Sequence, residues 1–406
     1  MKHKVFFLLI SVMLMGILAA CSSEETSGNN SKESGTQSIE LWHYFEGNLK
    51  DVLEDNVTKY NESQDKVEVK LTFVPYGELN NQLLISGTND ATPDLVITGI
   101  NEVQLFAESG VLEDMTANVE EWENNDQITE DIMDIHKVDD NVYGLPIKTN
   151  AIVMFYNKDM VEEPPTTWEE LKKTAADATD GKQTGFLASA HNSQQGTASW
   201  IPFLISAGED ITTIGSDGGK EALQLWKDMV DEGSMSSEAV NKTIMDAQVD
   251  FQNGNTAMTL TGPWFIPELE ANAPDLNWGV AEIPKDEKHV SLVGGESISM
   301  GKGANKEAAW DFISWFLEPE NHFEYAKATG DFPALEDAFN EPYFQDDPVK
   351  QVFVNVIKSS SGYGWGENQG DFNQIVYTAM QKALTGEATV EEAVTEAQQK
   401  VDQILQ

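Results

Sequence analysis

The sequence predicts an α/β protein, because segments with the two-residue period of a strand alternate along the chain with segments that have the period of a helix. The 406 residues are enough for about two or three domains or lobes with buried cores. In one early segment, Val67, Val69 and Leu71 alternate with polar residues, as in a half-buried strand. This alternation of elements favours layers built on largely parallel sheets.

The first half of the chain contains most of the predicted strands. In chain order the sequence predicts a strand from Ile39, a helix between Phe45 and Tyr60, a strand over 67–73, a helix that ends near Ile85, and strands at 93–97 and 151–156. The last two are continuous apolar runs, and such runs suit a sheet that is covered on both faces.

The later helices have clearer boundaries. Thr167 and Glu170 form a capping box that starts a helix at Trp168. Apolar stripes indicate two more helices, over 305–317 and 390–404.

The composition limits what the protein can bind. The 69 Asp and Glu residues outnumber the 25 basic residues, all of them Lys, and the net charge of −44 excludes a nucleic-acid-binding protein. A single Cys excludes a disulfide framework and a cysteine zinc site. Arginine, the usual clamp for carboxylates and phosphates, is absent, so a neutral or cationic ligand fits better.

The N-terminus has the pattern of a secretion signal. Lys2 and Lys4 precede a short apolar run that ends in Leu18-Ala19-Ala20-Cys21. This ending resembles the bacterial lipobox, which implies a signal peptide over 1–20, a lipid such as palmitate on Cys21, and an extracellular protein anchored at the cell membrane. Segment 21–37 is polar and predicts a flexible tether. The alternative is a transmembrane anchor, for which the apolar run is short.

The chain shows no pattern typical of an enzyme. Its histidines are isolated, none has the spacing of a zinc site, and no Gly-x-Ser-x-Gly elbow occurs. We therefore expect no catalytic residues, no metal and no cofactor. Several Trp residues instead stand beside Gly, Pro or polar residues, as Trp200, Trp264 and Trp365 do. A flat aromatic face suits a sugar ring, although a large aromatic residue is more often part of a core.

An ordered series of short motifs identifies a family. The motifs are Ile39-Glu40-Leu41-Trp42, Thr92-Pro93-Asp94-Leu95-Val96, Tyr143-Gly144-Leu145-Pro146, Phe155-Tyr156-Asn157-Lys158-Asp159, Pro164-Pro165-Thr166-Thr167-Trp168, Met258-Thr259-Leu260-Thr261-Gly262-Pro263-Trp264, Asn305-Lys306-Glu307-Ala308-Ala309-Trp310 and Gly330-Asp331-Phe332-Pro333-Ala334. Over about residues 38–406 the chain resembles the extracellular solute-binding proteins of carbohydrate ABC transporters, of the maltodextrin-binding type.

The resemblance implies a two-lobed periplasmic-binding-protein-like fold of type II, with discontinuous lobes joined by a hinge and a ligand cleft between them. We expect lobe one at 38–147 plus 293–335 and lobe two at 148–292 plus 336–406. It also implies a monomer that binds a neutral mono- or oligosaccharide and delivers it to the permease subunits of an ABC transporter, with no nucleic acid as a partner. Two alternatives stay open: a cationic, polyamine-like ligand in the same fold, and a surface glycosidase.

The resemblance also implies which residues contact the ligand. Tyr44 and Glu46 follow the first strand, where relatives contact sugar. Asn101 and Asn150 stand where relatives often carry acids. Trp264 matches a stacking tryptophan. Together with Trp200, which its local context alone suggests, the full predicted set is Tyr44, Glu46, Asn101, Asn150, Trp200, Trp264, Gly295, Glu296 and Trp365.

Overall fold

The computed structural model describes residues 35–89, 91–360 and 365–406. Residues 36–406 form one unit by their mutual contacts. The predicted signal peptide at 1–20, the predicted lipidation at Cys21 and most of the predicted tether lie outside the described residues. The first strand, β1 (Gln37–His43), begins where the tether was predicted to end.

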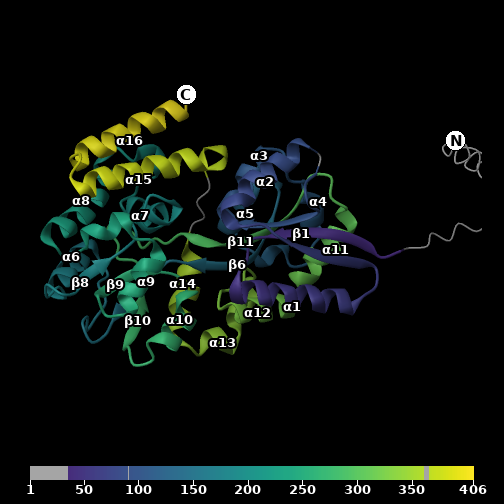
Figure 1. The fold of residues 1–406 in the computed structure, drawn as a ribbon, viewed down its shortest axis with the longest axis horizontal. Helices are drawn as coiled ribbons and strands as arrows, with labels where there is room; N and C mark the ends of the chain where they lie inside the picture. Colours follow the sequence, from purple (N-terminus) through teal and green to yellow (C-terminus); the bar gives the residue numbers. More distant parts are fainter. Residues whose placement is uncertain (1–34, 90, 361–364) are drawn as a thin grey trace, which may run out of the picture. The chain divides into compact units, whose positions relative to one another are not determined.

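The first sheet has five strands in the order β2-β1-β3-β11-β6. Figure 1 labels its strands β1, β6 and β11. Strands β1, β2 and β3 pair in parallel, whereas β11 pairs antiparallel with both β3 and β6. The bounds of the four further strands are β2 (Val67–Phe73), β3 (Leu95–Gly99), β6 (Leu145–Ala151) and β11 (Val293–Met300).

The second sheet has four strands in the order β10-β7-β9-β8. Strand β7 is antiparallel to both of its neighbours, and β8 is parallel to β9. Each sheet is therefore mixed: the other strands share one direction, as the prediction of largely parallel sheets expects, but β11 in the first sheet and β7 in the second run against them. The strands are β7 (Val153–Asn157), β8 (Thr184–Leu187), β9 (Thr256–Thr261) and β10 (Trp278–Ala281).

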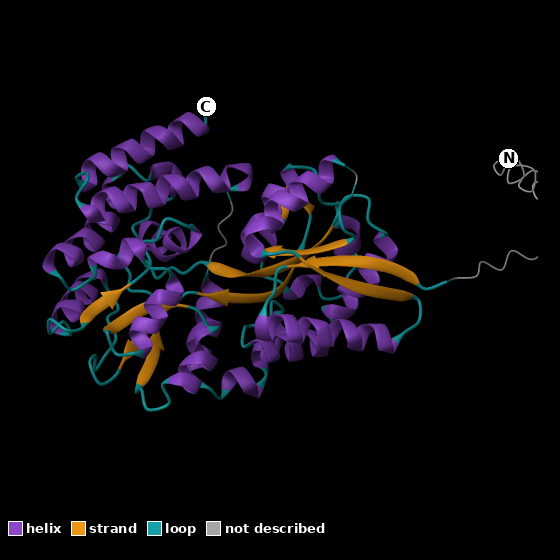
Figure 2. Cartoon of the chain, viewed as in Figure 1, coloured by secondary structure: helices purple, strands orange, loops and turns teal. Residues whose placement is uncertain are grey.

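Apolar runs form strands that are buried on both faces, as predicted. In β3, Leu95 and Ile97 belong to a core that also contains residues of helices α1 and α11, while Val96 packs on the other face with Phe106. The helices that pack with the first sheet appear in Figure 2. They are α1 (Gly47–Ser63), α11 (Lys306–Phe316) and α12 (Pro319–Thr329) for the first core, and α2 (Tyr76–Thr88) and α3 (Val103–Glu108) for the opposite face.

The second sheet is also covered on both faces. In β7, Met154 and Tyr156 face a core that contains Trp226, and Phe155 faces Phe251 and Phe265. The helices that contribute to the core with Trp226 are α6 (Trp168–Asp177), α7 (Gln194–Ser206), α8 (Asp217–Glu232), α15 (Gln369–Thr385) and α16 (Val390–Ile404). Helices α9 (Ile244–Gln252), α10 (Phe265–Asn272) and α14 (Pro348–Ser359) contribute to the core that contains Phe155.

The remaining elements are short. They are α4 (Thr116–Glu120), α5 (Glu130–Asp134), α13 (Pro342–Gln345), the two-stranded sheet of β4 (Lys137–Val138) and β5 (Asn141–Val142), and the 3-10 helices η1 (Ile100–Glu102), η2 (Asn125–Gln127), η3 (Ile211–Thr213), η4 (Ser237–Asn241), η5 (Glu336–Asn340) and η6 (Gly366–Asn368). Within the described ranges, no helix has the length and apolar character needed to cross a bilayer.

The predicted helix starts agree with the structure in place and partly in mechanism. Helix α6 begins at Trp168, and the Thr167 hydroxyl accepts a hydrogen bond from the backbone N–H of Glu170 at 3.2 Å. The Glu170 carboxylate accepts from the N–H of Thr166 at 2.8 Å instead of from Thr167. The cap therefore reaches one residue further back than a regular capping box.

The predicted lobe boundary at 335/336 falls within a continuous core. Phe344 and Phe353, which follow it, belong to the same core as Phe332 and the first sheet. The ring centroids of Phe332 and Phe353 lie 5.4 Å apart. The division into lobes stays a prediction.

Two buried histidines predict a loss of stability in acid. Burial lowers the pKa of His322 to about 3 and that of His136 to about 4. In the folded chain His322 Nε2 accepts a hydrogen bond from the N–H of Ala334 at 2.7 Å, so this nitrogen carries no proton. The unfolded chain takes up these protons near the ordinary pKa of about 6.5. The contribution of these two histidines to the free energy of unfolding is therefore complete above about pH 6.5 and falls as the pH drops toward 4.

We expect each histidine to contribute a slope of about 1.4 kcal/mol per pH unit in that interval. Urea unfolding between about pH 6 and pH 4.5 should show a shallower dependence in His322→Gln than in the original chain, even though the variant is less stable at every pH. Equal slopes in the two proteins would contradict the assignment to His322.

Candidate functional site

Three cavities meet at Trp264. Their volumes are about 420, 380 and 390 Å³, and the indole of Trp264 borders all three. Asn101 is shared by the first and second, Asn150 by the first and third, and Glu296 by the second and third. The three cavities therefore form one continuous cleft, and we refer to them as the amide, junction and charged compartments in that order.

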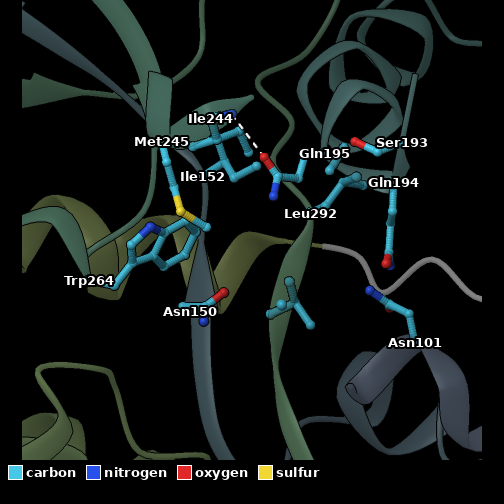
Figure 3. Close-up of a pocket in the computed structure, with 13 residues that line it drawn as sticks. Asn101, Asn150, Ile152, Ser193, Gln194, Gln195, Ile244, Met245, Trp264 and Leu292 are labelled. Atoms are coloured by element: carbon cyan, nitrogen blue, oxygen red, sulfur yellow. Dashed lines mark hydrogen bonds between the residues drawn. The ribbon is translucent and has the colours of Figure 1, made fainter. Parts of the chain in front are cut away.

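The position of Trp264 follows from the loop that carries it. Strand β9 ends at Thr261, and Gly262-Pro263 lead directly into helix α10. A Cβ atom on Gly262 would lie 1.9 Å from the ring of Trp264, so only glycine leaves room for the indole to fold back over the turn. The side chain remains 38% exposed, and Met245 points toward it across the amide compartment (Figure 3).

The amide compartment is uncharged. Of the described residues that line it, none has a charged side chain, and its polar groups are mainly the amides of Asn101, Asn150, Gln194 and Gln195. Figure 3 shows Asn101 and Gln194 extending toward each other. Among the described residues the buried Oδ1 of Asn101 has no hydrogen-bond partner. Amides next to apolar side chains offer donors and acceptors without charge, as a neutral polar ligand requires.

The charged compartment has an ion cluster at its floor, formed by Lys148, Glu296 and Asp331. Lys148 Nζ lies 2.8 Å from Oε2 of Glu296 and also contacts Oδ2 of Asp331. Tyr44 donates its hydroxyl hydrogen to Oε1 of Glu296 at 3.1 Å, and the Asn150 amide donates to Oδ1 of Asp331 at 3.4 Å. We call Lys148, Glu296 and Asp331 together the ion cluster.

The surroundings keep Lys148 charged. Burial of the ammonium lowers the pKa of Lys148, but the charges of Asp331 and Glu296 outweigh this effect and raise the pKa above its ordinary value. In the junction compartment the burial of Glu102 raises the pKa of that carboxyl, and the nearby charge of Glu296 acts in the same direction.

The ion cluster joins three segments that are distant in sequence. Lys148 on β6 lies directly opposite Glu296 on β11, and the neighbouring Thr149 exchanges backbone hydrogen bonds with Phe332 at 2.7 and 3.0 Å. Gly295 has a φ of +127°, and a Cβ atom there would lie 2.2 Å from the Lys148 carbonyl oxygen. This glycine therefore allows β11 to approach β6 closely enough for the ion pair.

Most of the predicted site residues come together in this cleft. The three compartments are lined by Tyr44, Glu46, Asn101, Asn150, Trp264, Gly295 and Glu296. Their contact with a ligand stays a prediction.

Two predicted residues lie elsewhere. Trp200 does not line the cleft, which corrects its prediction as a site residue. It is 1% exposed inside α7 and belongs to the core of the second sheet, and its indole N–H donates to the Ala222 carbonyl at 3.4 Å. Its ring faces are therefore covered by protein. Trp365 is half-buried, packs edge-on against Phe372 at 5.6 Å between ring centroids, and lines none of the three compartments.

Several lining residues were not predicted. Ser193, Gln194 and Gln195 lie at the start of α7, and Ile244 and Met245 at the start of α9. Gln195 accepts a hydrogen bond from the backbone N–H of Ile244 at 2.9 Å, which links the two helix starts (Figure 3). Polar residues at the start of a helix that follows a strand were the available signal.

The described lining of the cleft offers amides, carboxylates and an indole that can bind a polar ligand. Among residues 35–89, 91–360 and 365–406, no group of His, Cys, Asp and Glu side chains is placed to hold a metal ion. The carboxylates at the floor are tied to Lys148, Tyr44 and Asn150.

Comparisons with known proteins agree with this description. The chain is 24% identical over 419 residues to the galactooligosaccharide-binding protein of Bacillus subtilis, which covers 98% of this chain and 95% of the relative. It is 25% identical over 367 residues to a maltooligosaccharide ABC transporter solute-binding lipoprotein of Streptococcus pneumoniae, covering 85% of this chain and 83% of the relative.

The fold also matches solved structures of such proteins. The cyclic α-maltosyl-1,6-maltose binding protein of Arthrobacter globiformis is 25% identical, with a TM-score of 0.82 over 91% of this chain and 99% of that chain. The predicted periplasmic-binding-protein-like α/β fold is thereby confirmed, with the mixed sheets described above. The family model for bacterial extracellular solute-binding proteins matches residues 56–351, so the chain belongs to this family of solute-binding proteins, which are not enzymes.

Proposed function

We propose that the protein is the sugar-binding component of an ABC transporter, which captures a neutral mono- or oligosaccharide and delivers it to the membrane permease. The observation that carries this proposal is the exposed indole of Trp264 beside an uncharged compartment lined with amides. An indole face stacks on the C–H face of a sugar ring, and amides exchange hydrogen bonds with the hydroxyls at its edge. The names of the Bacillus and Streptococcus relatives support the same ligand class.

The proposed mechanism is capture by closure. Lobe one, at 38–147 plus 293–335, and lobe two, at 148–292 plus 336–406, would close on the sugar, and contacts made only in the closed arrangement would shift the population toward it. The protein acts as a monomer, held at the extracellular face of the cell membrane by a lipid on Cys21. The lipoprotein named among the relatives supports this anchor.

A thermal-shift screen tests the proposal. The purified protein is heated with neutral oligosaccharides, with polyamines, and with sugar phosphates. A ligand that binds the folded chain alone raises the unfolding midpoint by mass action, by an amount equivalent to about 2.7 kcal/mol at a hundred times the dissociation constant. We expect a rise with one class of neutral sugar, and recovery of that sugar intact after overnight incubation.

The other outcomes separate the alternatives. A rise with polyamines alone would favour a cationic ligand, for which the acidic side chains of the charged compartment give a specific reason. Hydrolysis of the sugar would contradict a role in binding alone.

A further inference from the structure

The ion cluster at the floor of the charged compartment is not electrically balanced. Lys148 supplies one positive charge, and Glu296 and Asp331 supply two negative charges. Lys148 is 2% exposed and Asp331 3% exposed, so neither exchanges its partner for solvent. One negative charge therefore remains at the floor of the cleft.

Glu296 presents this charge to the cleft. Its side chain is 14% exposed and lines both the junction and the charged compartments. Tyr44 donates to one carboxylate oxygen, and Lys148 pairs with the other. Oε2 is buried, so a ligand has to use Oε1, which has a further lone pair beside the hydrogen bond from Tyr44 and can accept an additional donor.

The rest of the compartment adds to the negative potential. The exposed carboxylates of Glu46 and Glu268 line the same cavity of about 390 Å³. Among the described residues that line the three compartments, Lys148 is the one with a positively charged side chain. That charge is already taken up by Glu296 and Asp331, so an anionic ligand would find no cation to pair with.

We propose that Glu296 and the unbalanced ion cluster set the charge selectivity of the cleft, so that it admits neutral sugars and rejects sugars that carry a carboxylate, sulfate or phosphate. The inference rests on the proposed function and assigns its preference for neutral sugars to particular residues. A sugar hydroxyl at this point donates to the carboxylate of Glu296, whereas an anionic group placed there meets a like charge in a partly desolvated site.

Matched pairs of sugars test the proposal. Maltotriose and β-1,4-galactotriose are each compared in the neutral form and after oxidation of their C6 hydroxymethyl groups to carboxylates, by thermal shift and by titration calorimetry with the purified protein. We expect at least one neutral form to bind, and its oxidised form to bind at least about 100-fold more weakly.

Two variants locate the effect. Glu296→Gln and Asp331→Asn each remove one negative charge from the cluster and leave Lys148 with one carboxylate. We expect either variant to reduce the discrimination between neutral and oxidised sugar to below about tenfold. Glu296→Asp keeps the charge and should keep the discrimination. Glu307→Gln, an exposed change of the same net charge on α11, is the matched control and should leave it unchanged.

The possible results test the charge selectivity, its assignment to the ion cluster and the proposed function separately. Oxidised sugars that bind as well as neutral ones would overturn the charge selectivity and leave the proposed function standing. Discrimination that persists in both Glu296→Gln and Asp331→Asn would overturn its assignment to the ion cluster. If none of the neutral sugars of the thermal-shift screen binds, the proposed function is overturned and this inference with it.

Discussion

Replacement of Lys148 by methionine is expected to lower the free energy of unfolding by about 3–5 kcal/mol, the scale of breaking a buried ion pair by removal of one partner. Methionine keeps most of the volume of the side chain but none of its charge. Glu296 and Asp331 would then lie close together at the floor of the cleft without a counter-ion. Because the cluster also joins β6 to β11 and to the segment at Phe332, the loss would loosen three segments at once.

Urea unfolding at neutral pH measures this effect. The matched control is Lys173→Met, which removes an exposed ion pair with Asp177 on the surface of α6. Exposed pairs of this kind contribute at most about 1 kcal/mol. A loss in Lys148→Met no larger than in the control would show that the buried charge does not stabilise the fold.

Replacement of Trp264 by alanine is expected to weaken sugar binding by about 1–3 kcal/mol, or roughly 5- to 150-fold in the dissociation constant. The indole borders every compartment of the cleft, so a sugar in any of them loses a stacking surface. Stability should change little, because the ring is 38% exposed and stands outside both cores.

Calorimetry with a sugar identified by the thermal screen gives the dissociation constant of Trp264→Ala. Phe73→Ala is the matched control, since Phe73 is a similarly exposed aromatic residue on β2 that lines none of the three compartments. An unchanged dissociation constant in Trp264→Ala would remove this residue from the binding site.

The strands and helices could be predicted from the sequence more reliably than the way they pair. The apolar run at Leu95–Ile97 indicates a strand covered on two faces, and β3 is such a strand. Strand β11 lies between β3 and β6 and runs antiparallel to both. About 140 residues separate it from β6, so the pairing is not one of consecutive strands. Periodicity carries no information about strand direction, because an alternating pattern is the same read in either sense.

The residues of the cleft could also be predicted only in part, because local sequence context does not show where the fold places a side chain. Trp264 stands next to Gly262-Pro263, a local context that separates it from helical core residues. Trp200 precedes Ile201-Pro202, but this proline lies inside helix α7, where the indole is buried. For Gln194 and Gln195 the one signal in the sequence is their position at the start of a helix after a strand, and this does not show that they reach the cleft, since that depends on how the second sheet positions the start of α7.

The shared position of Trp264 has a consequence for how binding energy can be divided. A ligand that fills one compartment already covers part of the indole, and a second sugar unit in the next compartment finds that surface partly occupied. The contributions of successive sugar units should therefore be non-additive, since groups that share a partner are coupled. Affinity would rise less with chain length than independent subsites allow, and short and long chains of one sugar would compete on nearly equal terms.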